Sequence, residues 1–195
     1  MRRTLTLLLI LFTLPVSHAQ NVRFSTGALD NGLTYPIADY SGHPEAKKAL
    51  NENILEIVSR FKDQDYCISQ YGFVQHNKFI QLNFYFNCID LDESEKPSYL
   101  FNLTDGELCP PSSMFSEDLE SSQSFFRKKI STHYAENGQE APKEFIHNLT
   151  IDDCTVSLLE KGLEISIESQ ENWPDKNLLI TWAELTPYLK HLQSR

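Results

Sequence analysis

Positive charge is scarce in this sequence. It contains 17 Lys and Arg against 27 Asp and Glu, which gives a formal net charge of −10. Because proteins that bind nucleic acid neutralise its phosphates with Lys and Arg, this balance argues against a nucleic-acid partner. A surplus of carboxylates attracts cationic partners, and it also serves general solubility. The composition therefore leaves a cationic partner open and excludes a nucleic-acid one.

Motifs of known catalytic chemistry are missing. The sequence contains no Gly-x-Ser-x-Gly elbow, no His-Glu-x-x-His motif and no phosphate-binding loop. Its histidines are scattered without the spacing of metal ligands. Adjacent acids such as Asp152 and Asp153 point in different directions, so they do not make the carboxylate pair of a glycosidase. We therefore expect no catalytic residue, no cofactor and no metal.

Long apolar runs are also missing, except for one from Leu5 to Leu14. This run follows Arg2 and Arg3 and precedes a small-residue cleavage site that ends at Ala19, which is the pattern of a secretory signal peptide, residues 1–19. It is shorter than the roughly 20 residues of a transmembrane helix. We expect a periplasmic or secreted chain without a membrane anchor after cleavage, and loss of the two arginines changes the net charge from −10 to −12.

Cysteine is limited to four residues, Cys67, Cys88, Cys109 and Cys154, all in the exported part. An even number in an oxidising compartment indicates two disulfides, and four cysteines permit three connectivities. We predict the pairs Cys67–Cys88 and Cys109–Cys154. A zinc site is the alternative, but the sequence has neither a Cys-x-x-Cys pair nor a matching histidine spacing.

The clearest feature that is present is a β-hairpin over residues 66–88. Asn77 and Lys78 lie between two aromatic-rich runs, and Asn tolerates the left-handed backbone of a tight turn. With these two residues as the loop, Cys67 falls opposite Cys88 in a pair whose Cα atoms are about 4.5 Å apart, near the short end of the disulfide range. The same register gathers the apolar residues on one face: Tyr71, Phe73, Ile80, Leu82, Phe84 and Phe86.

The rest of the chain combines amphipathic helices with short strands. Apolar residues at helical spacing predict helices over 44–61 and 117–134. Extended segments are expected at 22–24, 33–37, 98–103, 154–159, 163–168 and 177–181, and Thr181 and Glu184 form a capping box. Gly162 is expected to adopt positive φ in the second hairpin. Roughly 175 residues without a linker fit one domain with a single core, so we predict an α+β fold over 20–195, an antiparallel β-sheet packed against amphipathic helices.

Five segments occur in an order and spacing that resemble a known family. They are PEAKKALNENI at 44–54, YLFNLTDGEL at 99–108, MFSED at 114–118, EKGLEISIE at 160–168 and LLITWAELTPYL at 178–189. Together they resemble the RsiV-like domain family, found in the ectodomain of a lysozyme-sensing anti-sigma factor and beside the catalytic domain of a secreted peptidoglycan deacetylase. The closing LLITWAELTPYL is the most specific segment. The family's glycine-rich stretch after the first hairpin is replaced here by Asn87, Cys88, Ile89 and Asp90.

The resemblance implies an extracytoplasmic, non-catalytic binding module, since in the deacetylase the chemistry belongs to a separate domain. It also implies a cationic protein such as lysozyme, or peptidoglycan, as the partner. Two acidic loops are the exposed tips where we expect this partner, and the candidate residues are Asp92, Glu93, Glu95, Glu171, Trp173 and Asp175. A cell-wall hydrolase or deacetylase, and a structural envelope protein without a soluble ligand, are the alternatives.

Overall fold

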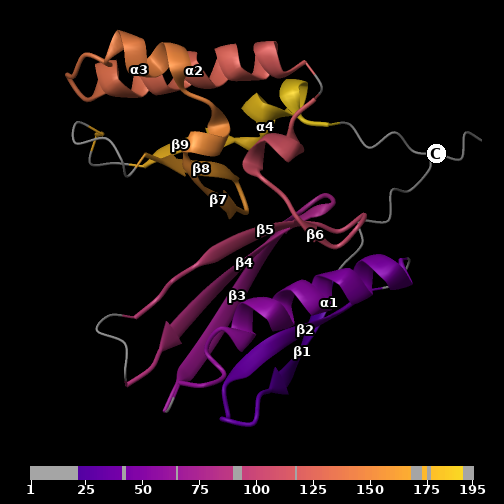
Figure 1. The fold of residues 1–195 in the computed structure, drawn as a ribbon. Helices are drawn as coiled ribbons and strands as arrows, with labels where there is room; N and C mark the ends of the chain where they lie inside the picture. Colours follow the sequence, from indigo (N-terminus) through magenta and orange to yellow (C-terminus); the bar gives the residue numbers. More distant parts are fainter. Residues whose placement is uncertain are drawn as a thin grey trace, which may run out of the picture.

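The computed structural model describes residues 22–40, 43–64, 66–89, 94–116, 118–167, 173–174 and 177–190. The predicted signal peptide, residues 1–19, lies outside this part. The described strands pair antiparallel and are accompanied by helices, so the predicted α+β class is confirmed (Figure 1). No helix in the described part is long and apolar enough to span a membrane.

The first half of the chain is a pair of sheets beside one helix. Strands β1 (Arg23–Ala28) and β2 (Thr34–Asp39) form a hairpin, and α1 (Pro44–Ser59) follows close to the predicted bounds. Strands β3 (Ile68–His76), β4 (Phe79–Asn87), β5 (Ser98–Asn102) and β6 (Glu107–Leu108) pair in that order. The apolar stripe of α1 and the apolar face of β4 are buried in one cluster, because helical and strand periodicities each gather apolar side chains on one side.

The hairpin of β3 and β4 has the predicted register. Ser69 pairs with Phe86 and Phe73 with Leu82. Asn77 in the turn has φ 53°, the left-handed conformation that the tight turn requires. The disulfide between Cys67 and Cys88 closes the open end of the hairpin, with Cα atoms 4.0 Å apart. The predicted register and the first predicted disulfide are confirmed.

The second half is a three-stranded sheet with helices. Its strands are β7 (Thr155–Leu159), β8 (Gly162–Ser166) and β9 (Leu178–Thr181), and its helices are α2 (Leu119–Glu136), α3 (Lys143–Asn148) and α4 (Trp182–Leu185). Short 3₁₀ turns occupy Pro111–Met114, Ile151–Asp153 and Thr186–Tyr188. The capping box of Thr181 and Glu184 is confirmed. The prediction that Gly162 adopts positive φ is wrong. Gly162 lies in β8, and a Cβ there would come 2.1 Å from the Ile180 carbonyl oxygen, so the glycine allows β8 and β9 to approach each other closely.

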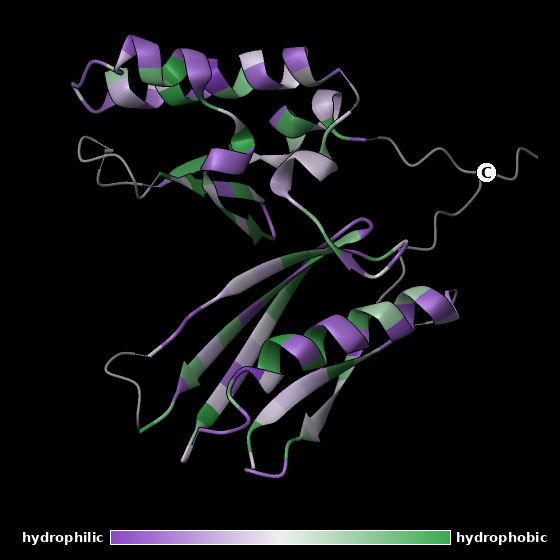
Figure 2. Cartoon of the chain, in the orientation of Figure 1, coloured by the Kyte–Doolittle hydropathy of each residue, from purple (hydrophilic) through white to green (hydrophobic). Residues whose placement is uncertain are grey.

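The buried apolar side chains of the described part form two clusters, so the prediction of a single core is wrong. One cluster joins α1 to the sheets of the first half, and the other joins α2 and α4 to β7–β9. Figure 2 shows hydrophobic residues in both halves, alternating with polar residues along α1 and α2. The described strands accordingly form three sheets and not one. The turn end of the hairpin belongs to the second cluster, since Phe79 is buried there and Val74 and Leu100 pack against it.

Gln81 of β4 joins the two halves. Its side chain is buried, and its Nε2 donates to the Val156 carbonyl oxygen at 2.8 Å and to Ser98 Oγ at 2.7 Å. Its Oε1 accepts from the backbone N–H of Leu158. Nearby, the His76 ring stacks on Trp182 with centroids 3.5 Å apart. The Gln81 amide thus pairs with the edge of β7 much as a neighbouring strand would.

Replacing Gln81 by leucine tests this joint. Gln81→Leu leaves the N–H of the buried Leu158 and the carbonyl of the half-buried Val156 without their partner, and a buried unsatisfied group costs about 1–3 kcal/mol. We expect the free energy of unfolding, measured by urea denaturation, to fall by about 3 kcal/mol. Gln70→Leu, at an exposed position of β3, is the control and should change it by less than about 0.5 kcal/mol. Equal losses in the two variants would contradict the assignment.

Candidate functional site

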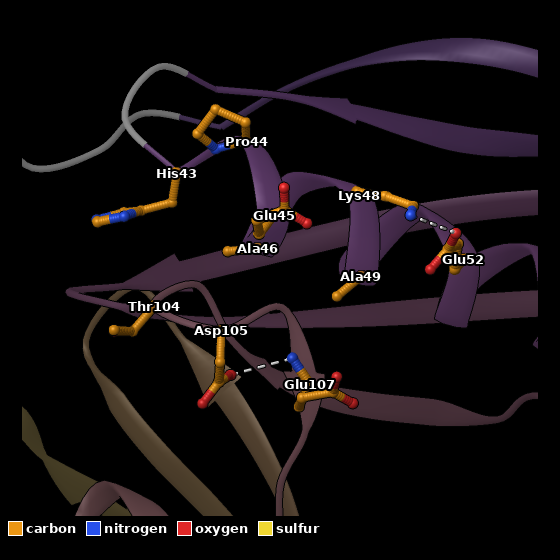
Figure 3. Close-up of a pocket in the computed structure, with 10 residues that line it drawn as sticks. All are labelled: His43, Pro44, Glu45, Ala46, Lys48, Ala49, Glu52, Thr104, Asp105 and Glu107. Atoms are coloured by element: carbon orange, nitrogen blue, oxygen red, sulfur yellow. Dashed lines mark hydrogen bonds and ion pairs between the residues drawn. The ribbon is translucent and has the colours of Figure 1, made fainter.

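A groove of about 470 Å³ lies between the start of α1 and the turn that joins β5 to β6 (Figure 3). We call it the acidic groove, because four of its ten lining residues carry carboxylates. It is lined by His43, Pro44, Glu45, Ala46, Lys48, Ala49, Glu52, Thr104, Asp105 and Glu107. Figure 3 shows the helix residues on one wall and the turn residues on the other.

Gly106 brings the turn against the helix. Its φ of 80° lies in the left-handed region, and a Cβ there would come 2.0 Å from the Ala46 carbonyl oxygen. Only glycine therefore allows this approach. Asn53 of α1 fixes the contact, since its Nδ2 donates to the Gly106 carbonyl at 3.1 Å and to Glu107 Oε2 at 3.3 Å. The two walls of the groove are thus bonded directly to each other.

Asp105 is a fixed negative charge in the groove. Its Oδ1 accepts from the Glu107 N–H at 3.0 Å, and its Oδ2 accepts from Asn102 Nδ2 at 3.2 Å. Asn102 also accepts from the Thr104 N–H at 3.1 Å, which closes the turn. Burial, followed by the charge of Asp105, raises the pKa of Tyr40, whose hydroxyl donates to the backbone behind the turn. The turn thus orients this carboxylate through several bonds.

The helix wall adds carboxylates at the start of α1. Glu45 lies in the first turn, where the helix dipole favours a negative charge. Its carboxylate forms no ion pair with a described residue. Lys48 and Glu52 form an exposed pair at 3.8 Å, which contributes little stability. The groove therefore presents carboxylate oxygens from two elements, an arrangement that can receive an ammonium or guanidinium group.

Of the predicted partner-binding residues, the two that the structure describes, Glu95 and Trp173, do not line this groove. Asp92, Glu93, Glu171 and Asp175 lie outside the described residues. Glu95 is exposed, and its backbone pairs with Phe86 of β4. Trp173 is half-buried and packs against Tyr134 and His133 in the second cluster. The two described candidates thus belong to different halves, and the structure does not bring them together.

Cys109 and Cys154 are free thiols, so the second predicted disulfide is wrong. Both belong to the second cluster, and each has its own backbone contact. The Cys154 thiol donates to the Thr150 carbonyl at 3.6 Å, whereas Cys109 follows β6 and bonds through its N–H to Leu100. Burial raises the pKa of Cys109 to about 11 and that of Cys154 to about 12. Both behave as small apolar core residues.

Comparisons with known proteins give structural likenesses only. No protein-family model matches the sequence, and no curated protein matches it. A DUF3298 family protein from Pseudomonas aeruginosa PAO1 is similar over 88% of this chain and 94% of that chain, with 12% identity and a TM-score of 0.42. A DUF3298 family member from Bacteroides fragilis NCTC 9343 is similar over 88% and 92%, with 10% identity and a TM-score of 0.39.

The two free thiols should resist alkylation in the native protein. Only thiolates react, and the raised pKa of both groups keeps them protonated at pH 8. Because Cys109 is also half-buried and Cys154 buried, we expect mass spectrometry to show much slower N-ethylmaleimide modification of the native protein than of the unfolded protein. Unfolding without reductant should give two adducts, at Cys109 and Cys154, while Cys67 and Cys88 stay unmodified. The absence of adducts after unfolding would show that a second disulfide exists.

A methyl group at Gly106 should separate the walls of the groove. Gly32→Ala is the matched control, because Gly32 has a similar φ of 83° but nothing within 4 Å of its added Cβ. The left-handed conformation alone costs an alanine about 1–2 kcal/mol. We expect Gly106→Ala to lower the free energy of unfolding by a further 2 kcal/mol or so, because packed backbone must move. The free energies of unfolding are measured by urea denaturation. If the losses in Gly106→Ala and Gly32→Ala agree within about 0.5 kcal/mol, the close approach of the turn to α1 is contradicted.

Proposed function

We propose that this chain is an extracytoplasmic, non-catalytic binding module whose partner is a cationic protein. The acidic groove is the observation that carries this proposal, because it holds carboxylates from α1 and from the 104–107 turn on bonded walls. The Cys67–Cys88 disulfide supports an oxidising compartment. The proposed role of the groove is to accept a Lys or Arg side chain of the partner.

Charge complementarity explains how such a partner would be recognised. The chain's net charge of −10 attracts a cationic protein over long range and raises the association rate. At close range, Glu45 and Glu107 offer carboxylates on opposite walls, where an arginine fork can bind with defined geometry. Binding of this kind weakens as salt screens the charges.

The finer proposal is an RsiV-like module that binds a lysozyme-like muramidase. Two of the segments that resemble this family, 44–54 and 99–108, form the two walls of the acidic groove. A cationic muramidase has the charge that the groove favours. Peptidoglycan is the second candidate partner, and it rests on the resemblance alone.

Retention of lysozyme on the immobilised full chain tests the proposal. The double variant Glu45→Lys/Glu52→Lys reverses two charges of the groove and should weaken binding at least tenfold. Glu120→Lys/Glu136→Lys is the matched control. It also reverses two exposed acidic residues of one helix, Glu120 in the first turn of α2 and Glu136 at its end. The control variant should bind lysozyme within about threefold of wild type. Both double variants change the net charge by the same amount, so the long-range field alone cannot explain a difference between them.

Several outcomes would overturn the proposal. Absence of retention at both low and physiological salt removes the lysozyme partner, and equal losses in the two double variants remove the groove as its site. Sugars or acetate released from peptidoglycan by the purified chain would favour the hydrolase or deacetylase alternative. Sedimentation with peptidoglycan, without retention of lysozyme, would favour a wall-bound envelope role.

A further inference from the structure

A second depression, of about 310 Å³, lies between α2 and α3 and has the opposite charge. We call it the basic depression. Among the residues that the structure describes, its lining contains three side chains that can carry positive charge and no carboxylate, in a chain with 27 Asp and Glu. The lining residues are Arg127, Ser131, Ala141, Lys143, Ile146 and His147.

The polar lining residues converge because of helical spacing. Arg127 and Ser131 are four residues apart on α2, and Lys143 and His147 are four residues apart on α3, so each pair lies on one face of its helix. The two helices run side by side at the edge of the second half (Figure 1). Two donors from each helix therefore face a shared space.

Arg127 is positioned by the backbone and has no ion-pair partner among the described residues. Its Nε donates to the Leu149 carbonyl oxygen at 3.1 Å, which orients the guanidinium group. Neither Arg127 nor Lys143 forms an ion pair with a described residue. By contrast, Lys129, two residues further along α2, is paired with Glu184. The cations of the basic depression thus keep their capacity to bind an anion.

We propose that the basic depression binds a phosphate group. A guanidinium group presents a planar fork of N–H donors that matches two phosphate oxygens. Lys143 and His147 supply further charge or donors to the remaining oxygens, and the Ser131 hydroxyl adds another donor. The half-buried Ala141 and Ile146 give the space an apolar side, where the carbon atoms of a phosphate ester can lie. A soluble phosphate ester and a lipid headgroup both carry this chemistry.

Titration of the full chain with inorganic phosphate, followed by NMR chemical shifts, tests the site. We expect saturable shifts in residues of α2 and α3, and at least tenfold weaker binding in Lys143→Gln/His147→Gln. Both of these residues are exposed, so the fold should survive. Lys128→Gln removes an exposed lysine of α2 that does not line the depression, and it should bind phosphate within about twofold of wild type.

Further binding experiments distinguish a soluble phosphate ester from a lipid headgroup. Stronger binding of glycerol phosphate than of acetate supports a phosphate ester as the ligand. Cosedimentation with phosphatidylglycerol vesicles, lost in Lys143→Gln/His147→Gln and absent with phosphatidylcholine, supports a headgroup. Equal affinity for acetate, an unchanged double variant or an equal loss in Lys128→Gln each overturns the proposal. The groove variants leave this site intact, so the two proposals fail separately.

Discussion

The buried amide of Gln81 is the interaction on which the arrangement of the two halves depends. A Gln side chain offers two donor hydrogens and an acceptor oxygen, and here both atoms are bonded, to β7 and to Ser98. A half-satisfied buried amide would be costly, so the bonds favour one placement of β7 against β4. The stack of His76 on Trp182 extends the same contact toward α4. Each half has its own core, and the polar joint acts together with the apolar contact of Phe79 with the second cluster to hold the two cores against each other.

Local patterns in the sequence were enough to predict the two long helices and most of the strands, but not α3, β6 or the contacts between elements. The register of β3 and β4 follows from an Asn77 turn and a period-two pattern, and α1 follows from apolar residues at helical spacing. Both signals lie within about twenty residues. The packing of the 104–107 turn against α1, in contrast, depends on Gly106 meeting a helix that is distant in the sequence. The contact of Gln81 with β7 likewise joins residues that are distant in the sequence, and no local period encodes it.

The two disulfide predictions show the same distinction. Cys67–Cys88 rested on a register that placed the two Cα atoms at bonding distance, and the structure confirms it. Cys109–Cys154 rested only on the number of cysteines left over, without any pairing of strands between them. Disulfides require specific Cα and Cβ geometry, so an even count is weak evidence by itself. In this chain the two remaining thiols fill space in the second core.

The distribution of charge matters more for recognition than the net value does. A net charge of −10 creates a field that favours the approach of cations, including the cationic partner that we propose for the acidic groove, and opposes the approach of anions to the whole molecule. The phosphate binding that we propose at Arg127 and Lys143 therefore depends on short-range donors with fixed geometry and not on long-range steering. Repulsion beyond about 8 Å is screened at physiological salt, so moderate salt should reduce this penalty while it weakens attraction at the groove. The two surfaces should consequently respond to ionic strength in different ways, although one chain carries both.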